Sequence, residues 1–176
     1  NHSSKDLANA IEISQDNNID IRPTWMPFSP WTKQKDLIDI IKLIENYKLR
    51  ETVDPIQLTI KLLIPKHSLI IQRSEISEFI NDYDKNSLSY VWDYRDKEVN
   101  ELQISLFNYL LENPDLDDHS QYLGMVEIIE TMTRSNLILD PNYRFKNVPK
   151  LSETWFCCAE PSPIQLNRIK TNNALI

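Results

Sequence analysis

The chain has 176 residues and a formal net charge of −7, from 19 Lys and Arg residues against 26 Asp and Glu residues. This length suits one domain or part of a larger one, and it is enough to bury a hydrophobic core. The acidic balance argues against a protein that binds nucleic acid by neutralising phosphates. Average usage would give about twelve glycines, but Gly124 is the only one, which excludes a Walker loop and a Rossmann fingerprint within the chain.

The two cysteines, Cys157 and Cys158, are adjacent, so they cannot close the loops of a disulfide framework. The three histidines are scattered, and a structural zinc site needs about four ligands in paired spacing. We therefore expect no metal site made by this chain alone. No apolar stretch approaches the roughly 20 residues of a membrane span, and no signal peptide is evident, so we expect a cytoplasmic protein without membrane contact.

The first part of the chain predicts a helix, a strand, a loop and a second helix. Ser3 or Ser4 is a plausible N-cap of the opening helix. A strand is expected over 19–26, and the proline-rich stretch 27–32 is expected to form a loop because proline cannot continue a sheet. Thr32 is the predicted N-cap of the second helix, whose apolar residues recur at the spacing of one buried face.

Residues 56–64 carry the clearest pattern. Ile and Leu residues alternate there with mainly polar ones, a period of two that fits a strand and not a helix. Strand, helix and strand form a β-α-β unit, so 19–26 and 56–64 should lie parallel. Ligands bind beyond the carboxyl ends of such strands, which here are the stretches 25–32 and 64–68.

The second half is predicted to be mainly helical. Apolar residues at helical spacing predict a short amphipathic turn over 76–83 and longer helices over 99–110 and 123–132. From 136 onward the chain is expected to be irregular, apart from a short helix over 164–169.

Two parallel strands cannot close a barrel, and they leave open sheet edges. Together with the absence of a starting methionine, this predicts that the chain is the carboxyl-terminal part of a larger α/β protein. We divide it into the last β/α units at 1–72, a helical extension at 73–135 and an irregular cysteine-containing tail at 136–176. The absent half should supply more strands and the cofactor chemistry.

The end of the first predicted strand concentrates large apolar side chains. Two Trp, one Phe and one Met lie between Thr24 and Thr32. Such a rigid apolar wall would suit stacking on a flat ring such as adenine. The alternative is that the same aromatic residues fill the end of a hydrophobic core, which is the commoner role of large aromatic residues.

The adjacent cysteines lie in the heptapeptide Trp155-Phe156-Cys157-Cys158-Ala159-Glu160-Pro161. Thiolates bind soft metals and thiophilic elements, attack electrophiles and relay electrons or hydrogen atoms. Adjacent cysteines can also bridge one thiophilic atom or close an easily reduced small-ring disulfide. The alternative is that they are two small buried hydrophobic residues.

A third stretch, 92–98, contains positively and negatively charged residues that would bind a polar substrate. The alternative, which we favour, is that Asp96 caps a helix beginning at Lys97 and that Glu98 lies at the positive end of that helix. The remaining charged residues of the stretch would then be solvated surface, where ion pairs are common and weak.

The heptapeptide resembles the terminal signature of the radical S-adenosylmethionine (SAM) proteins that are named for a CCAEP or CUAEP tail. Some members of that family carry selenocysteine at the second position. Residues 23–32 and 54–65 resemble the late strands of the family's barrel, and residues 88–92 and 151–153 resemble its helical extension and the lead-in to its tail. The likeness covers most of the chain, and the heptapeptide is its specific part.

This resemblance implies a fold and a set of cofactors. The fold would be the carboxyl-terminal part of a partial (β/α) TIM-like radical SAM barrel, with a helical extension and an irregular tail. In such barrels a 4Fe-4S cluster on a CxxxCxxC loop cleaves SAM to a 5′-deoxyadenosyl radical. This chain has no CxxxCxxC, so the cluster ligands would belong to the amino-terminal remainder of the barrel, and the chain alone is not expected to be active. An amino-terminal cobalamin-binding-like domain also fits relatives of this kind.

The resemblance also implies site residues. The last strands of the barrel shape the adenine and substrate side of its cavity, which implies cofactor contacts from a set of strand-end residues. These are Thr24, Trp25, Met26 and Phe28, with Leu63 and Ile64 behind them. The tail would fold back over the barrel mouth, where Cys157 and Cys158 donate a hydrogen atom or an electron, or bind a thiophilic small-molecule substrate such as an arsenic or selenium species. Glu160 would assist proton movement.

The competing function is a non-catalytic interaction module. In that alternative the amphipathic helices dock to a partner, and the cysteines are incidental or bridge a metal between chains. The sequence leaves the substrate, the reaction subclass and the oligomeric state open.

Overall fold

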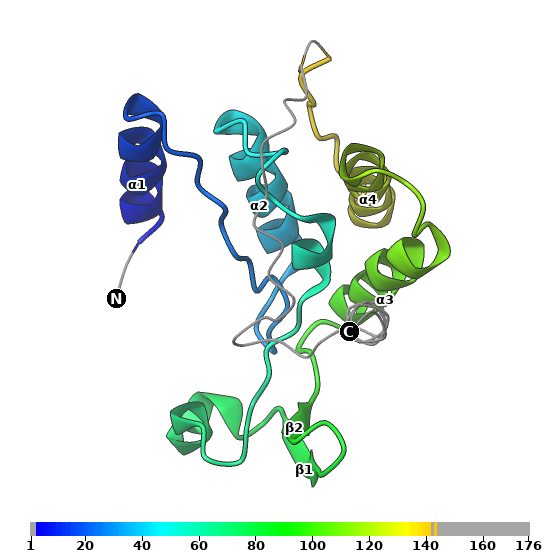
Figure 1. Ribbon diagram of the computed structural model, residues 1–176. Helices are drawn as coiled ribbons and strands as arrows, with labels where there is room; N and C mark the ends of the chain where they lie inside the picture. The colour runs from blue at the N-terminus through cyan, green and yellow to red at the C-terminus, as the bar shows by residue number, and fades with distance from the viewer. Residues whose placement is uncertain (1–2, 142, 144–176) are drawn as a thin grey trace, which may run out of the picture.

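The computed structural model describes residues 3–141 and 143 of the chain. Its elements in chain order are α1 (Ser4–Asp16), α2 (Gln34–Asn46), the 3₁₀ helices η1 (Pro55–Thr59), η2 (Leu69–Gln72) and η3 (Ser74–Ile76), the strands β1 (Ile80–Asp84) and β2 (Ser89–Trp92), α3 (Lys97–Glu112) and α4 (Asp118–Thr133). Figure 1 shows α2 in the middle, α1 on one side of it, α3 and α4 on the other, and the β1–β2 hairpin at one end. This mixture of helices with a small sheet is compatible with the predicted α/β class.

Two helices begin at the residues that the sequence predicts. Ser3 is the N-cap of α1, where its side chain and that of Asp6 each accept a hydrogen bond from the other's backbone N–H. Asp96 is the N-cap of α3, and its carboxylate accepts a hydrogen bond from the backbone N–H of Glu98 at 3.0 Å. Both predicted caps are confirmed, because capping depends on residues three or fewer positions apart.

The predicted N-cap of α2 is wrong by one residue. The N-cap is Lys33, whose backbone N–H donates to the Asp36 carboxylate at 2.9 Å. The Thr32 hydroxyl instead donates to the carbonyl of Pro27 at 2.8 Å and accepts from the N–H of Ser29. Thr32 therefore closes the 27–32 loop on itself immediately before the helix.

The core is one large hydrophobic cluster that joins the four α-helices. Its buried residues include Ile11, Leu37, Ile41, Ile44, Val99, Leu102, Leu106, Met125 and Ile129. The apolar faces predicted for the long helices are thus the buried ones. A smaller cluster of Ile64, Ile76 and Trp92 lies beside the hairpin. None of the helices in the described part of the chain is long and apolar enough to cross a membrane.

The predicted strand over 56–64 does not form: its first half belongs to η1, and its second half holds only isolated bridge residues at Lys61 and Leu62. Pro55 begins this 3₁₀ helix, and the N–H of Gln57 donates to the carbonyl of Asp54 at 2.9 Å. The polar residues of the alternating pattern do not face solvent, because Gln57 and Thr59 are 2% and 4% exposed. The Thr59 hydroxyl donates to the Ile56 carbonyl at 2.8 Å, so burial of these polar side chains is compensated by hydrogen bonds.

The predicted strand over 19–26 is also wrong, since no regular strand forms there. The expected parallel association is present two residues later, as a single bridge between Phe28 and Lys61. The Phe28 N–H donates to the Ile60 carbonyl at 3.2 Å, and the Leu62 N–H donates to the Phe28 carbonyl at 2.7 Å. No barrel is present among residues 3–141 and 143.

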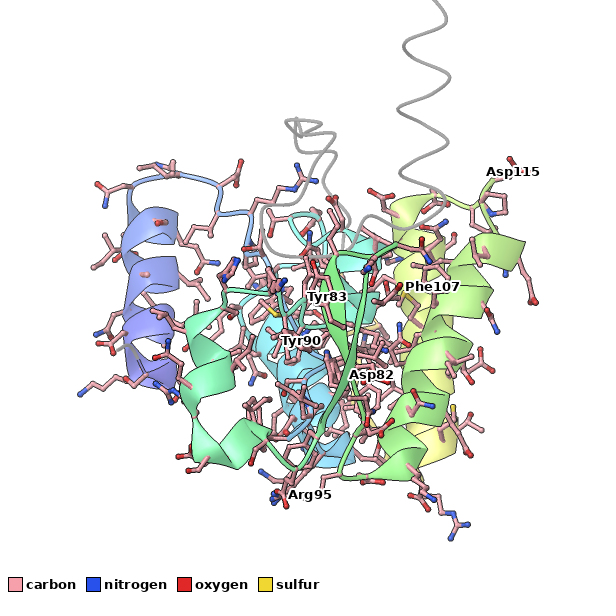
Figure 2. The ribbon with its side chains drawn as sticks, turned by 90° about the horizontal axis from the view of Figure 1, so that it is seen from below. Asp82, Tyr83, Tyr90, Arg95, Phe107 and Asp115 are labelled. Atoms are coloured by element: carbon pink, nitrogen blue, oxygen red, sulfur yellow. The ribbon has the colours of Figure 1, made fainter. Side chains whose placement is uncertain are left out.

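The amphipathic helical turn predicted over 76–83 is wrong as well. Residues Ile80–Asp84 form β1, which pairs antiparallel with β2. The connecting turn contains no glycine: the Asp84 carboxylate accepts backbone hydrogen bonds from the two residues Asn86 and Ser87, and Leu88 has a φ of 54°. Across the hairpin, the rings of Tyr83 and Tyr90 lie edge to face, 5.1 Å apart (Figure 2).

The only glycine of the chain, Gly124, lies in α4 against a side chain of α3. A Cβ atom placed on Gly124 of α4 would lie 2.0 Å from the hydroxyl oxygen of Tyr109 and 2.3 Å from the ring carbon that carries it. Tyr109 belongs to α3, so the absent side chain at 124 makes room for an aromatic ring between the two helices.

We expect Gly124→Ala to lower the free energy of unfolding by about 1 kcal/mol, because overlap in a packed contact costs about 1–3 kcal/mol and outweighs the roughly 1 kcal/mol helix preference of alanine. In a Tyr109→Leu background the same substitution should stabilise the protein, since the clashing atoms are gone. Urea denaturation of the four proteins measures both effects. A stabilising Gly124→Ala in the wild-type background would contradict the packing described.

Candidate functional site

The candidate site is built around residues 60–64, which we call the central segment. On one side its main chain pairs with Phe28, as described above. On the other side it contacts β2: the Ile64 carbonyl accepts from the Tyr90 N–H at 2.9 Å, and the Ile64 N–H donates to the Ser89 hydroxyl at 3.0 Å. One main-chain network therefore joins the loop before α2, the central segment and the hairpin.

An aromatic cluster covers this junction. We define it as Phe28, Trp92 and Tyr94, together with Lys61. The Tyr94 ring lies edge to face with Phe28 at 6.3 Å and with Trp92 at 4.8 Å between centroids. The Lys61 ammonium lies 5.0 Å from the Trp92 ring and 5.5 Å from the Tyr94 ring. These distances fit cation–π attraction, so a positive charge is held among the rings.

Three polar groups of aromatic side chains in this region differ in whether they have a hydrogen-bond partner. The indole N–H of Trp92 donates to the Leu62 carbonyl at 2.8 Å. The Tyr94 hydroxyl is buried and has no hydrogen-bond partner among the described residues, and the same is true of the indole nitrogen of Trp25. Burial raises the pKa of the Tyr94 hydroxyl above its usual value, so the hydroxyl is protonated and uncharged at neutral pH.

A groove lies beside the central segment. It has a volume of about 580 Å³ and is lined by Trp31, Leu69, Ile70, Arg73 and Glu75. Its size lies in the range of small-molecule sites, and it combines an apolar floor with one positive and one negative side chain. The Trp31 ring packs edge to face against Phe79 at 6.1 Å, which fixes one wall of the groove.

The structure brings the predicted cofactor-contacting residues together only in part. Phe28 is fully buried and pairs with the central segment, and Ile64 is fully buried in the smaller cluster. Trp25 and Leu63 are half-buried, whereas Thr24 and Met26 are exposed. The predicted apolar wall is therefore divided between a packed core side and a solvent-facing side.

The predicted catalytic residues Cys157, Cys158 and Glu160 lie outside the described residues. Within the described ranges, 3–141 and 143, no group of three or more His, Cys, Asp and Glu side chains is arranged to hold a metal ion.

Three members of the aromatic cluster are not indicated by the sequence patterns. Lys61 fits the alternating pattern over 56–64 as one of its polar residues, and Trp92 and Tyr94 belong to the charged stretch 92–98. Trp92 is the last residue of β2 and Tyr94 follows two residues later, and this spacing is the signal that would place both rings on one side of the chain. No protein family, curated protein or solved structure was found to match the chain.

Trp92 and Tyr94 make a matched pair for mutagenesis. Trp92→Phe should lower the free energy of unfolding by about 2 kcal/mol, because it leaves the Leu62 carbonyl without this donor and removes buried ring volume. Tyr94→Phe should leave stability unchanged or raise it slightly, since it removes a buried hydroxyl that has no partner in the described structure. Thermal or urea denaturation measures both. A large loss for Tyr94→Phe would mean that its hydroxyl is satisfied.

Proposed function

We propose that this chain is the carboxyl-terminal portion of a radical SAM enzyme and carries a redox-active or thiophile-binding CCAEP tail. The observation that carries the proposal is the heptapeptide 155–161. Relatives with this tail place selenocysteine at its second position, and selenium changes acidity and redox behaviour more than shape. A reactive role for Cys158 therefore fits the resemblance better than packing alone does.

The pairing of Phe28 with the central segment supports the proposal. These two stretches are separated by α2, yet their main chains run parallel where they bridge. A parallel pair joined through a helix is the unit that repeats in (β/α) barrels. The side chains that the loop before α2 leaves accessible near this junction are Trp25 and Met26, half-buried and exposed, and an aromatic ring beside an apolar chain would suit contact with a nucleoside.

The chain does not fit a 4Fe-4S cluster by itself. The cluster of radical SAM proteins takes three cysteines in a CxxxCxxC loop, and this chain has only two cysteines, adjacent to each other. Cluster binding and the cleavage of SAM are therefore assigned to the amino-terminal remainder of the barrel, as is any cobalamin-binding domain. This chain would contribute nucleoside and substrate contacts, and the thiols.

The thiols have two proposed roles. As hydrogen-atom donor, Cys157 or Cys158 would break its S–H bond, reduce a substrate radical and become a thiyl radical. As ligands, the two thiolates would bind one arsenic or selenium atom of the substrate, since adjacent sulfurs can share one thiophilic atom. Glu160 would accept or return the proton that a thiol loses.

Exposed apolar side chains favour the alternative, an interaction module. Leu69, Leu88 and Val91 are 76%, 65% and 49% exposed, and all lie on η2 or the hairpin. Apolar surface of this kind is commonly covered by a partner. In the enzyme, that partner would be the amino-terminal remainder of the barrel.

The complete protein that contains this chain, reconstituted with iron and sulfide and supplied with a strong reductant, should release 5′-deoxyadenosine from SAM. Mass spectrometry of the quenched reaction measures it. The control is the 176-residue chain treated in the same way, which should release none. A complete protein that lacks CxxxCxxC, or that binds a cluster and leaves SAM intact, would exclude the enzyme and favour the interaction module.

The adjacent thiols should bind a trivalent monoaryl arsenical such as phenylarsine oxide through both sulfurs. Cys157→Ser and Cys158→Ser should each weaken binding by about 100-fold or more, because the second sulfur binds intramolecularly. Ser162→Ala, in the same tail, is the matched control and should bind like the wild-type chain. Calorimetric titration measures the affinities, and single variants as tight as the wild type would rule out binding by both thiols.

A further inference from the structure

The groove beside the central segment takes its apolar lining from two separate parts of the chain. One part is Trp31, near the end of the 27–32 loop, and the other is Leu69 and Ile70 of η2. Figure 1 shows η2 and η3 at the same end of the molecule as the hairpin. A ligand in this groove can therefore place one apolar group against each part of the lining.

Both parts of the apolar lining are held in place by contacts outside the groove. Trp31 and Ile70 pack against the smaller cluster beside the hairpin, and the Trp31 ring also packs on Phe79. The residue before Trp31 is fixed as well, because the Pro30 carbonyl accepts a hydrogen bond from the Arg95 N–H at 3.0 Å. A lining that is already ordered loses little conformational freedom when a ligand binds.

The groove is also lined by two side chains of opposite charge, Arg73 and Glu75. Within the described part of the chain they form no ion pair with each other, and the Arg73 guanidinium has no carboxylate partner. Three other arginines do pair with a carboxylate: Arg22, Arg50 and Arg95. Arg73 can therefore bind a ligand carboxylate through both guanidinium nitrogens, and Glu75 can bind a ligand ammonium group.

The spacing of these two charges indicates the length of the ligand. Arg73 has an extended backbone between η2 and η3, with φ −87° and ψ 132°, and two residues of chain span at most about 7 Å. The amine and the terminal carboxylate of a dipeptide are separated by a similar length of chain. A free amino acid carries both charges on one carbon, and longer peptides carry them further apart, so a dipeptide with free termini fits best.

We propose that this groove binds a dipeptide that has free termini and two large apolar side chains. Arg73 binds its carboxylate and Glu75 its ammonium group, while the side chains lie against Trp31 and against Leu69 and Ile70. The groove volume of about 580 Å³ lies within the range of small-molecule sites. The proposal is independent of the radical SAM function, because neither the heptapeptide 155–161 nor a nucleoside takes part.

Blocked peptides test the two charged contacts. The probe is leucylleucine, titrated into the 176-residue chain and followed by heteronuclear NMR. Arg73→Gln should weaken its binding by about fivefold, and Glu75→Gln by about threefold, because ion pairs open to solvent contribute little each. Arg73→Gln should not change binding of the carboxyl-terminal amide of the peptide, and Glu75→Gln should not change binding of its N-acetyl form, since each blocked group has lost its charge.

Arg134→Gln is the matched control, because it removes the same charge at the carboxyl end of α4; it should bind leucylleucine like the wild-type chain. No binding of leucylleucine at about 10 mM would overturn the proposal. Losses that are equal for the free and the blocked peptides would also overturn it, because the charged termini would then make no contact with Arg73 and Glu75.

A second set of measurements tests the apolar contacts and the ligand length. Leu69 is 76% exposed, so Leu69→Ser should leave the fold intact and weaken leucylleucine binding by about fivefold through lost apolar contact. Leu88→Ser, at a residue of the hairpin turn that is 65% exposed, is the matched control and should have no effect. Glycylglycine and free leucine should each bind at least about tenfold more weakly than leucylleucine. Free leucine that binds as tightly as leucylleucine would overturn the assignment of a dipeptide.

Discussion

The structure depends on hydrogen bonds to the main chain of the central segment, which are made on both of its sides. A buried N–H or carbonyl without a partner costs as much as a lost hydrogen bond, and no regular sheet surrounds residues 60–64 to supply partners. Phe28 pairs with Ile60 and Leu62 on one side, and on the other side Ser89, Tyr90 and the Trp92 indole supply partners for Ile64 and Leu62. The position of the hairpin is therefore tied to that of the 27–32 loop.

Because the chain has a single glycine, residues of other types occupy the left-handed backbone positions that follow its helices. The helices α1, α2 and α4 are each followed by a left-handed residue that is not glycine: Asn18, Lys48 and Arg134, with φ values of 54°, 56° and 52°. After each of these residues the next N–H bonds back into the helix, as Leu49 does to the Ile44 carbonyl at 2.9 Å, the pattern of a Schellman cap. The turn at Lys48 directs Arg50 and Glu51 back toward α2, and the turn at Arg134 directs the chain toward them.

Helices could be predicted from the sequence and the sheet could not, for a physical reason. Helix signals are local: the caps Ser3 and Asp96 act within three residues, and buried faces follow a fixed spacing. The alternation over 56–64 was misleading because Gln57 is buried by a partner 32 residues away, the N–H of Trp25. The hairpin was missed because its turn uses Asp84 and a left-handed Leu88 instead of the usual glycine.

The candidate site and the buried ion pair of Arg50 with Glu45 both depend on contacts between segments that are distant in the sequence. The parallel association of the stretch before α2 with the central segment was predictable, but the contacts of Phe28 with Lys61 and Tyr94 come from segments that the chain brings together only on folding. Likewise Tyr122 and Glu45 bond across 77 residues, so nothing near Arg50 in the sequence indicates that it is buried. The helix α2 connects these two regions: its amino end follows the Phe28 bridge, and its carboxyl end supplies Glu45. Because a helix is stiff over 13 residues, the distance between the ion pair of Arg50 with Glu45 and the central segment is fixed.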